Sequence, residues 1–151
     1  MSQETSQETS QTTASPQRLT GQCLCGKVGL ISTSGTLHAE ACHCGMCRKW
    51  SGGPYLAVAA GTEVSFNGEE HITRFSSSEW GERGFCKHCG SHLFYFLKPT
   101  GQYIVPAGLL DQESQLVMDQ QIFIDKKPAF YAFSNDTKNL TEEEVFAQFA
   151  P

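Results

Sequence analysis

The sequence predicts a mainly β fold with one short C-terminal helix. Three observations support this prediction. The chain has 151 residues with 39% hydrophobic content, which suits one domain with a modest core. Its apolar residues fall in short runs separated by Gly, Asn and Ser, as is typical of strands and turns. One stretch near the C-terminus carries clear signals for the start of a helix.

The predicted strands are short runs rich in β-branched and aromatic residues, bounded by turn-forming residues. The most apolar run, HLFYFL, should supply much of the core. The predicted strands are 27–32, 37–42, 55–60, 63–66, 72–75, 91–97, 103–106 and 121–125.

The predicted helix lies in LTEEEVFAQF, residues 140–149. Thr141 can cap it, and Glu144, three residues on, completes a capping box. Leu140 and Val145 are placed to form the hydrophobic staple of such a helix start. A weaker pattern indicates a short helical turn at 111–118.

The first 17 residues, MSQETSQETSQTTASPQ, repeat Ser-Gln-Glu-Thr and contain almost no apolar side chains. Such a segment buries too little surface to offset the entropy lost on ordering. We therefore predict a disordered polar tail at 1–17 and a single folded domain at 18–151.

Charge and hydropathy narrow the possible partners. The formal net charge is −5, and Lys and Arg are scattered, so nucleic acid is not an expected partner. No apolar run approaches the ~20 residues that span a bilayer, so no membrane partner is expected. The N-terminus also lacks the basic and apolar segments of a signal peptide, and we expect a cytoplasmic protein. The oligomeric state is not indicated by the sequence.

Seven cysteines are the most informative feature of the composition. In a reducing compartment, closely spaced cysteines favour metal binding or catalysis over disulfides. They fall in three segments, CLCG, CHCGMC and CKHCG, with Cys-x-Cys and Cys-x-x-Cys spacings that let two sulfurs converge on one zinc ion.

The simplest partition joins the two outer pairs, Cys23 with Cys25 and Cys86 with Cys89, into a closed four-thiolate structural zinc site. A glycine follows each of these pairs and eases a tight turn. Such a site contributes roughly 10 kcal/mol or more to folding, which is decisive for a small β domain.

The middle trio, Cys42, Cys44 and Cys47, then remains with three ligands, the pattern of a catalytic zinc with an open position. Alternatives remain: one of the three is a free thiol, or the segment donates two ligands to the closed site. A third alternative is a fourth protein ligand. The candidates for that ligand are His43, His88 and His92.

Several side chains near the trio could line a site. Arg48 and Lys49 follow Cys47 directly and are candidates to meet a substrate carboxylate or to screen thiolates; the alternative is that both are solvated surface cations. Trp50 and Tyr55 are expected in the core, with a pocket wall as the alternative. A final group is predicted to be ordinary exposed charges: Glu79, Glu82 and Arg83.

Three segments together carry a family resemblance: GQCLCGKVGL, CHCGMCRKWSGGPYLAV and FCKHCGSHLFYF. With the later GLLD and QIFIDKKPAFYAF, they resemble the glutathione-dependent formaldehyde-activating enzyme family, also called the CENP-V/GFA domain family. The resemblance runs from Gln22 to about Asn135. One departure from the resemblance is Phe130, where a Trp is usual in the family.

The resemblance implies a zinc-bearing, mostly β fold with two zinc ions per chain. By motif position, Cys23, Cys25, Cys86 and Cys89 match the structural ligands, and Cys42, Cys44 and Cys47 match the catalytic ones. The implied activity is a carbon–sulfur lyase reaction that interconverts glutathione plus formaldehyde with S-hydroxymethylglutathione. A substrate thiol would then take the fourth position of the three-cysteine site.

Two other functions compete with this one. A family-like zinc enzyme could act on another small electrophile, such as an imine. A non-catalytic zinc domain could instead bind a protein partner, as the CENP-V branch makes plausible. The polar, weakly charged tail offers no basic or apolar docking segment, which favours an enzyme.

Overall fold

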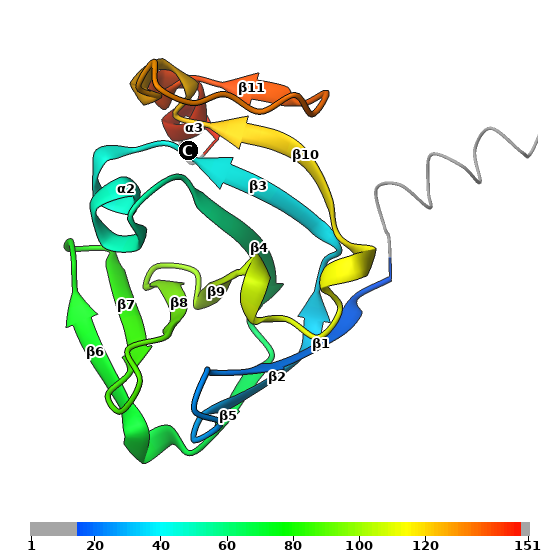
Figure 1. The fold of residues 1–151 in the computed structure, drawn as a ribbon, viewed down its shortest axis with the longest axis vertical. Coiled ribbons are helices and arrows are strands. Elements are labelled where there is room, and N and C mark those ends of the chain that lie inside the picture. Colours follow the sequence, from blue (N-terminus) through cyan, green and yellow to red (C-terminus); the bar gives the residue numbers. More distant parts are fainter. Residues whose placement is uncertain (1–14, 149–151) are drawn as a thin grey trace, which may run out of the picture.

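A computed structural model describes residues 15–148 of the chain. Figure 1 shows a curved, eight-stranded sheet that runs from β11 at the top to β6 at the lower left, with a three-stranded sheet at the bottom. The predicted mainly β fold with a short C-terminal helix is confirmed. Most of the predicted tail, residues 1–14, lies outside the described residues, and the first strand begins at Gln17.

The small sheet has the order β1-β2-β5 and the large sheet the order β11-β10-β3-β4-β9-β8-β7-β6. All pairings are antiparallel except those of β10 with β3 and with β11, which are parallel. The strands are β1 Gln17–Gln22, β2 Gly29–Gly35, β3 His38–Cys42, β4 Tyr55–Gly61, β5 Val64–Asn67, β6 Ile72–Ser76, β7 Gly81–Cys86, β8 His92–Leu97, β9 Gln102–Pro106, β10 Val117–Ile122 and β11 Lys138–Leu140.

Helices are short and few in residues 15–148. The α-helices are α2 Gly45–Ser51 and α3 Glu142–Ala147, and the 3-10 turns are η1 Glu69–His71, η2 Ala107–Leu109, η3 Glu113–Gln115 and η4 Ile124–Lys126. In this described part, no helix has the length and apolar composition needed to cross a membrane.

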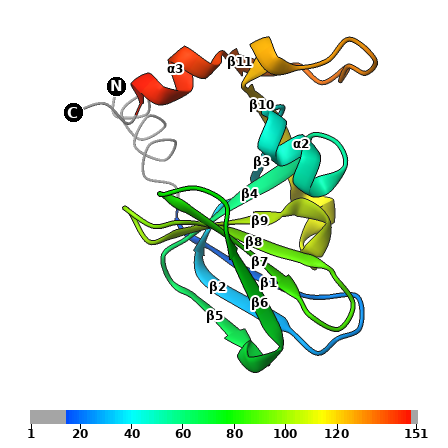
Figure 2. The ribbon, with the colours of Figure 1, turned by 90° about the vertical axis from the view of Figure 1, so that its left-hand side faces the viewer.

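The C-terminal helix confirms the capping prediction. Thr141 accepts from the backbone N–H of Glu144, and the Glu144 carboxylate accepts from the backbone N–H of Thr141. Leu140 and Val145, the predicted staple pair, are both buried. Figure 2 shows that α3 extends away from the sheets at the upper edge of the molecule.

The main core lies between the two sheets. Leu19 and Leu30 of the small sheet pack in one buried cluster with Val58, Phe94 and Val105 of the large sheet. Ser32, also fully buried, donates from its hydroxyl to the Ala60 carbonyl and so satisfies a polar group in this core. A second, smaller cluster contains Cys42, Cys47, Tyr55 and Ala57, next to α2. The three-cysteine trio is therefore packed apart from the main core.

Five elements differ from the sequence prediction. Strands β1, β7 and β11 and helix α2 were not predicted, and the strand expected at 121–125 lies instead at Val117–Ile122. The turn expected at 111–118 is present as η3. Strand β7 could not be predicted because its sequence, GERGFC, contains two glycines and two charged residues. A Cβ at Gly84 would lie 2.2 Å from the Phe94 ring, and one at Gly81 would lie 2.3 Å from the Tyr95 hydroxyl. The absence of a side chain at these two positions leaves room for the rings of Phe94 and Tyr95 on the neighbouring strand β8.

Candidate metal centres

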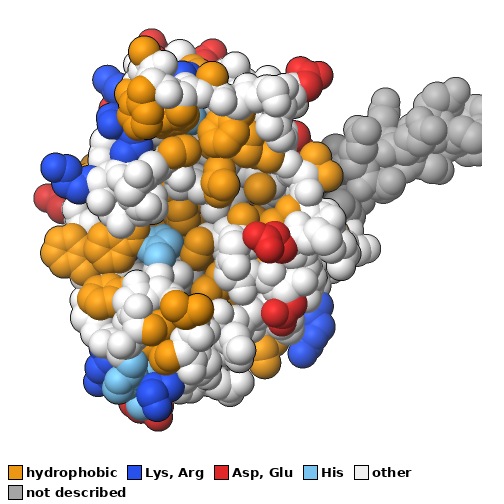
Figure 3. Space-filling model, viewed as in Figure 1, with side chains coloured by type: hydrophobic (Ala, Val, Ile, Leu, Met, Phe, Trp, Pro, Cys, Tyr) orange, Lys and Arg blue, Asp and Glu red, His pale blue; other side chains and the backbone are white. Residues whose placement is uncertain are grey.

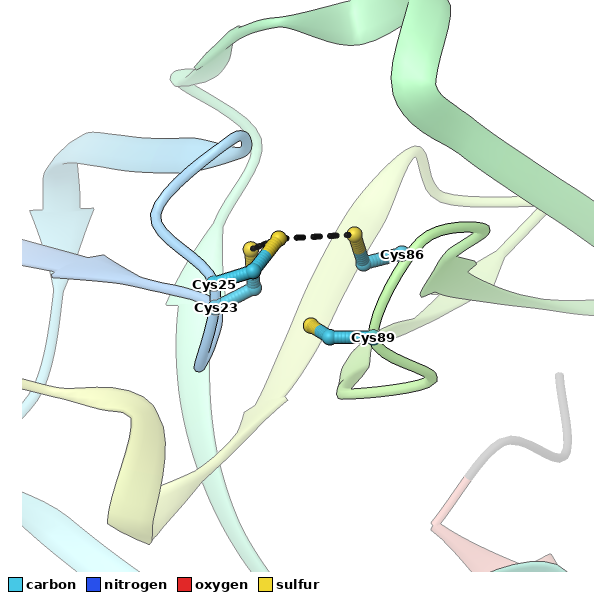
Figure 4. A group of neighbouring side chains, drawn as sticks. All are labelled: Cys23, Cys25, Cys86 and Cys89. Atoms are coloured by element: carbon cyan, nitrogen blue, oxygen red, sulfur yellow. Dashed lines mark hydrogen bonds between the residues drawn. The ribbon is translucent and has the colours of Figure 1, made fainter.

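The first cysteine cluster contains Cys23, Cys25, Cys86 and Cys89. Their sulfurs lie within 4.8 Å of one another. Cys23 and Cys25 lie on the loop after β1, and Cys86 and Cys89 lie at the end of β7 and on the loop to β8, so the cluster joins the two sheets (Figure 4). The sulfurs of Cys23 and Cys25 lie 3.7 Å apart, and those of Cys25 and Cys86 lie 3.8 Å apart.

Each of these two loops turns tightly so that its sulfurs converge. Gly26 and Gly90 both have positive φ, 82° and 78°, which glycine adopts without strain. The backbone N–H of Gly26 donates to the Cys23 carbonyl, and that of Gly90 donates to the Cys86 carbonyl. The glycine predicted to ease each turn is thus needed for its backbone conformation.

Backbone and hydroxyl donors favour the thiolate form of two cysteines of this cluster, Cys23 and Cys89. The N–H of Val28 donates to Cys23 Sγ at 3.3 Å, and Ser91 Oγ lies 3.2 Å from Cys89 Sγ. Contacts from the Ser91 hydroxyl and backbone lower the pKa of Cys89 to about 5. Because zinc binds the thiolate form, this environment suits a metal.

The second cluster contains Cys42, Cys44 and Cys47, whose sulfurs also lie within 4.8 Å of one another. Cys42 is the last residue of β3, Cys44 is the N-cap of α2, and Cys47 lies in its first turn. Cys44 Sγ accepts from the Cys47 backbone N–H at 3.3 Å, so the same side chain caps the helix and faces the other sulfurs. Cys42 and Cys47 are buried, and Cys44 is partly exposed.

The three thiols of the trio shift the pKa values of one another in opposite directions. The Cys42 and Cys47 thiols donate to Cys44, which lowers the pKa of Cys44 to about 2. Cys44 and Cys47, together with burial, raise the pKa of Cys42. A divalent cation held between the three sulfurs would allow all of them to ionise.

The two donor sets fit zinc differently. Four cysteines can complete a tetrahedral shell, whereas three leave one position open. Within residues 15–148, no histidine or carboxylate oxygen joins the trio at ligand distance. Both cysteine clusters could therefore hold a metal ion such as zinc, and the two outer pairs, not the middle segment, form the four-sulfur set.

His43 lies between two cysteines of the trio but has other partners. It is fully buried; its Nε2 donates to Gln121 Oε1 at 2.8 Å, and its Nδ1 accepts from the Tyr131 hydroxyl at 2.9 Å. Burial lowers the pKa of His43, which keeps the ring neutral. Both ring nitrogens are thus occupied, and His43 ties the loop after β3 to β10 and to the segment around Tyr131.

The other two histidines do not complete the trio. His88 is exposed, and its Nε2 lies 2.8 Å from Nδ1 of His71. His92 accepts from the Trp50 indole N–H and packs edge-on against the Tyr55 ring. Burial, and then the charge of Arg83, lower the pKa of His92 to about 4.

The cationic side chains near the trio differ from the expectation. Arg83, predicted to be an ordinary exposed charge, is 3% exposed, because it faces inward from β7 under α2. Its Nη2 lies 3.8 Å from Cys47 Sγ, and its guanidinium packs over the Tyr95 and Trp50 rings. Glu82, partly exposed, pairs with Arg74 at the surface.

Arg48 and Lys49, predicted as substrate contacts, point to different surroundings. Arg48 Nε donates to the His43 carbonyl at 2.9 Å, so it stabilises the loop of the trio. Lys49 is exposed and lines a hollow beside the trio. Trp50 also lines this hollow, whereas Tyr55 is buried, as expected of a core residue.

This hollow, which we call the α2–β7 hollow, has a volume of about 570 Å³. Its wall is formed by Met46, Lys49, Trp50, Phe75, Ser77 and Arg83. Figure 3 shows hydrophobic side chains gathered on this side of the molecule, between α2 and the β6–β7 hairpin, with Lys and Arg side chains beside them. A ligand here would contact apolar rings and positive charge.

The sequence profile of the family described as glutathione-dependent formaldehyde-activating enzyme matches residues 18–126, which include all seven cysteines. The chain belongs to this family. An uncharacterized lyase of Schizosaccharomyces pombe is 32% identical to it over 126 residues, which cover 83% of this chain and 92% of the relative. A crystal structure of a Rhodobacter sphaeroides protein superposes with a TM-score of 0.51 at 23% identity and covers 61% of this chain and 87% of that one. This similarity supports the fold.

Phe130, the expected departure from the family resemblance, is 82% exposed. Its ring packs edge-on against Tyr131, the residue that donates to His43. The Phe130 ring therefore packs against the segment that holds the loop of the trio through His43.

Proposed function

We propose that the chain is a zinc-dependent carbon–sulfur lyase-type enzyme that acts on a thiol–aldehyde adduct, like an S-hydroxymethylglutathione synthase. The observation that carries the proposal is the three-cysteine cluster with no fourth protein ligand in residues 15–148, beside a hollow large enough for a small thiol. Family membership and the relative named as a lyase support the reaction class.

The two clusters would have different roles. Cys23, Cys25, Cys86 and Cys89 would hold a structural zinc, and Cys42, Cys44 and Cys47 a catalytic one. A zinc ion on three thiolates supplies an open position where a thiol is held as a thiolate at neutral pH. The four-cysteine set has no such position and would serve the fold.

The reaction itself needs little from the chain beyond position and charge. In the synthetic direction the glutathione thiol loses its proton and its sulfur attacks the aldehyde carbon; a C–S bond forms as the C=O π bond breaks, and the oxygen takes up one proton, which balances the one lost by the thiol. The lyase direction reverses these changes. Arg83, beside Cys47, offsets the negative charge of the sulfurs, and the Trp50 ring forms an apolar wall for the bound adduct. Apolar walls strengthen these charge interactions by excluding water.

Several buried polar groups hold this arrangement without taking part in proton transfer. The Tyr55 hydroxyl donates to the Ile104 carbonyl at 2.9 Å, and burial raises its pKa well above the ordinary range. His43 has partners on both ring nitrogens. These groups fix the end of β3 and the start of α2, and therefore the spacing of the trio.

An assay with glutathione and formaldehyde, beside other thiols and imines, tests the proposal. We expect turnover of the thiol–aldehyde adduct well above the spontaneous reaction, and its loss in Cys44→Ser with one zinc ion of two retained. Preferential turnover of imines would reassign the substrate. If the zinc-loaded protein accelerates none of these reactions and its metals are indifferent to thiols, the enzyme assignment fails and a non-catalytic zinc domain is supported.

A further inference from the structure

Arg83 is a buried cation whose hydrogen-bonding capacity is only partly used. Its Nε donates to Ser77 Oγ at 3.2 Å, and its Nη2 contacts Cys47 Sγ at 3.8 Å. Its Nη1 is buried and has no acceptor among residues 15–148. A guanidinium has five N–H donors, and burying it without anionic partners is costly. One edge of the charged Arg83 guanidinium therefore has N–H donors that no described residue uses and that a ligand could accept from.

The surroundings of this edge indicate the chemistry of that ligand. Arg83 lines the α2–β7 hollow together with Lys49, and no described Asp or Glu lines it. Apolar rings also line the hollow: those of Trp50 and Phe75 stack with centroids 6.2 Å apart and an interplanar angle of 7°. An organic anion fits a hollow with two cations and flat apolar walls.

The position of Arg83 relative to the trio sets where this anion would lie. Because Nη2 lies 3.8 Å from Cys47 Sγ, an anionic group on Nη1 would be a few bonds from a sulfur held at the trio. A planar carboxylate matches the edge of a guanidinium, and one buried cation balances its single charge. A phosphate would bring up to two charges to this one buried partner.

We infer that Arg83 is a specificity-determining residue that selects thiols carrying a carboxylate close to the sulfur. Arg83 binds the carboxylate inside the α2–β7 hollow, and Lys49 adds positive charge at its exposed edge. This inference rests on the proposed function, since it places the ligand sulfur at the trio. It goes further in assigning the recognition of the substrate to a residue outside the cysteine motifs.

The test compares a matched pair of thiols, 3-mercaptopropionate and its neutral amide, on the zinc-loaded protein by titration calorimetry. We expect the acid to bind the wild-type protein about tenfold more tightly or better, as for a charge-assisted hydrogen bond. Arg83→Gln should remove this preference, and Arg83→Lys should keep part of it. Arg74→Gln is the control, because Arg74 is a guanidinium on the adjacent strand β6 that pairs with Glu82 at the surface. It should leave the preference unchanged.

The outcomes separate the two proposals. Cobalt-substituted protein reports thiol binding at the metal through its visible spectrum, so a spectrum unchanged by either thiol contradicts the proposed function itself. If both thiols change the spectrum but bind the wild type equally, the role of Arg83 is overturned and the proposed function stands. This wild-type comparison holds even where Arg83→Gln fails to fold. In turnover, the Gln variant should raise KM for acids only; an equal fall in kcat for acid and amide would also overturn the assignment.

Discussion

The two clusters of this domain consist of the same residue type, cysteine, but differ in their surroundings. The four-cysteine cluster is built on two glycine turns, joins the small sheet to the large one, and has backbone and serine donors around its sulfurs. The three-cysteine cluster lies at the end of β3 and the start of α2, with a buried cation and an apolar hollow beside it. The clusters therefore differ in the number of sulfurs and in their surroundings; on the proposed function, the four-cysteine cluster would stabilise the fold and the three-cysteine cluster would bind substrate.

The largest expected effect follows from removing one sulfur of the four-cysteine cluster. Cys86→Ser removes a fully buried sulfur that links β7 to the loop after β1. Because structural zinc contributes directly to folding, we expect the free energy of unfolding to fall by about 3 kcal/mol or more. Denaturant unfolding followed by circular dichroism, with a zinc count, measures this. A variant that holds one zinc ion fewer but unfolds at the wild-type denaturant concentration would contradict a structural role.

The corresponding change in the open cluster should separate activity from stability. Serine is a favoured N-cap, so Cys44→Ser keeps an acceptor for the Cys47 N–H and should preserve α2. It removes one of three metal ligands, and we expect activity to fall by at least about 100-fold. Melting temperature and activity are measured on the same preparation. Full activity with full metal content would rule out the catalytic assignment of the trio.

Removing metal stepwise should distinguish the clusters kinetically. The trio leaves one position for an outside ligand, so a chelator can attack its ion directly. We therefore expect the first zinc ion to leave with loss of activity and unchanged circular dichroism. The second should leave more slowly and with loss of the β signal. Simultaneous release, with unfolding in one phase, would show that the two sites do not differ as described.

A smaller effect is expected on the stability of the folded protein at acidic pH, through His92 near the three-cysteine cluster. The pKa of His92 is about 4 in the folded protein, below its ordinary value of 6.5, so the unfolded chain binds its proton first as pH falls. Stability should fall as pH is lowered from about 6.5 towards 4. His92→Gln retains an acceptor for Trp50 and should weaken this dependence. Denaturation midpoints of the two zinc-loaded proteins at pH 7, 6 and 5 give the comparison; parallel pH profiles would contradict the assignment.

Much of the site could be predicted from local sequence. Cys-x-Cys and Cys-x-x-Cys spacings on turns bring neighbouring sulfurs together whatever the rest of the chain does. The C-terminal helix start was equally local, since Thr141 and Glu144 bond to each other's backbone. Helix α2 was missed because its seven residues hold glycine and a run of polar side chains, and a cysteine caps it.

The identity of the cation beside the trio was decided only by tertiary structure. By sequence, Arg48 and Lys49 were the natural candidates because they follow Cys47, whereas Arg83 lay in what read as an exposed charged loop. Arg83 is buried because β7 pairs between β6 and β8, and because Gly81 and Gly84 admit the rings of Tyr95 and Phe94.

The sequence by itself thus determined which cysteines form each cluster and the mainly β class, because these depend on spacing and on local hydrogen bonds. Tertiary structure decided which charge faces the open cluster, because the direction of a strand side chain depends on how the strand pairs. It also decided that no histidine in residues 15–148 completes the trio, since His43, His88 and His92 take their partners from distant segments. Long-range pairing of this kind leaves no signal in the spacing of the cysteines.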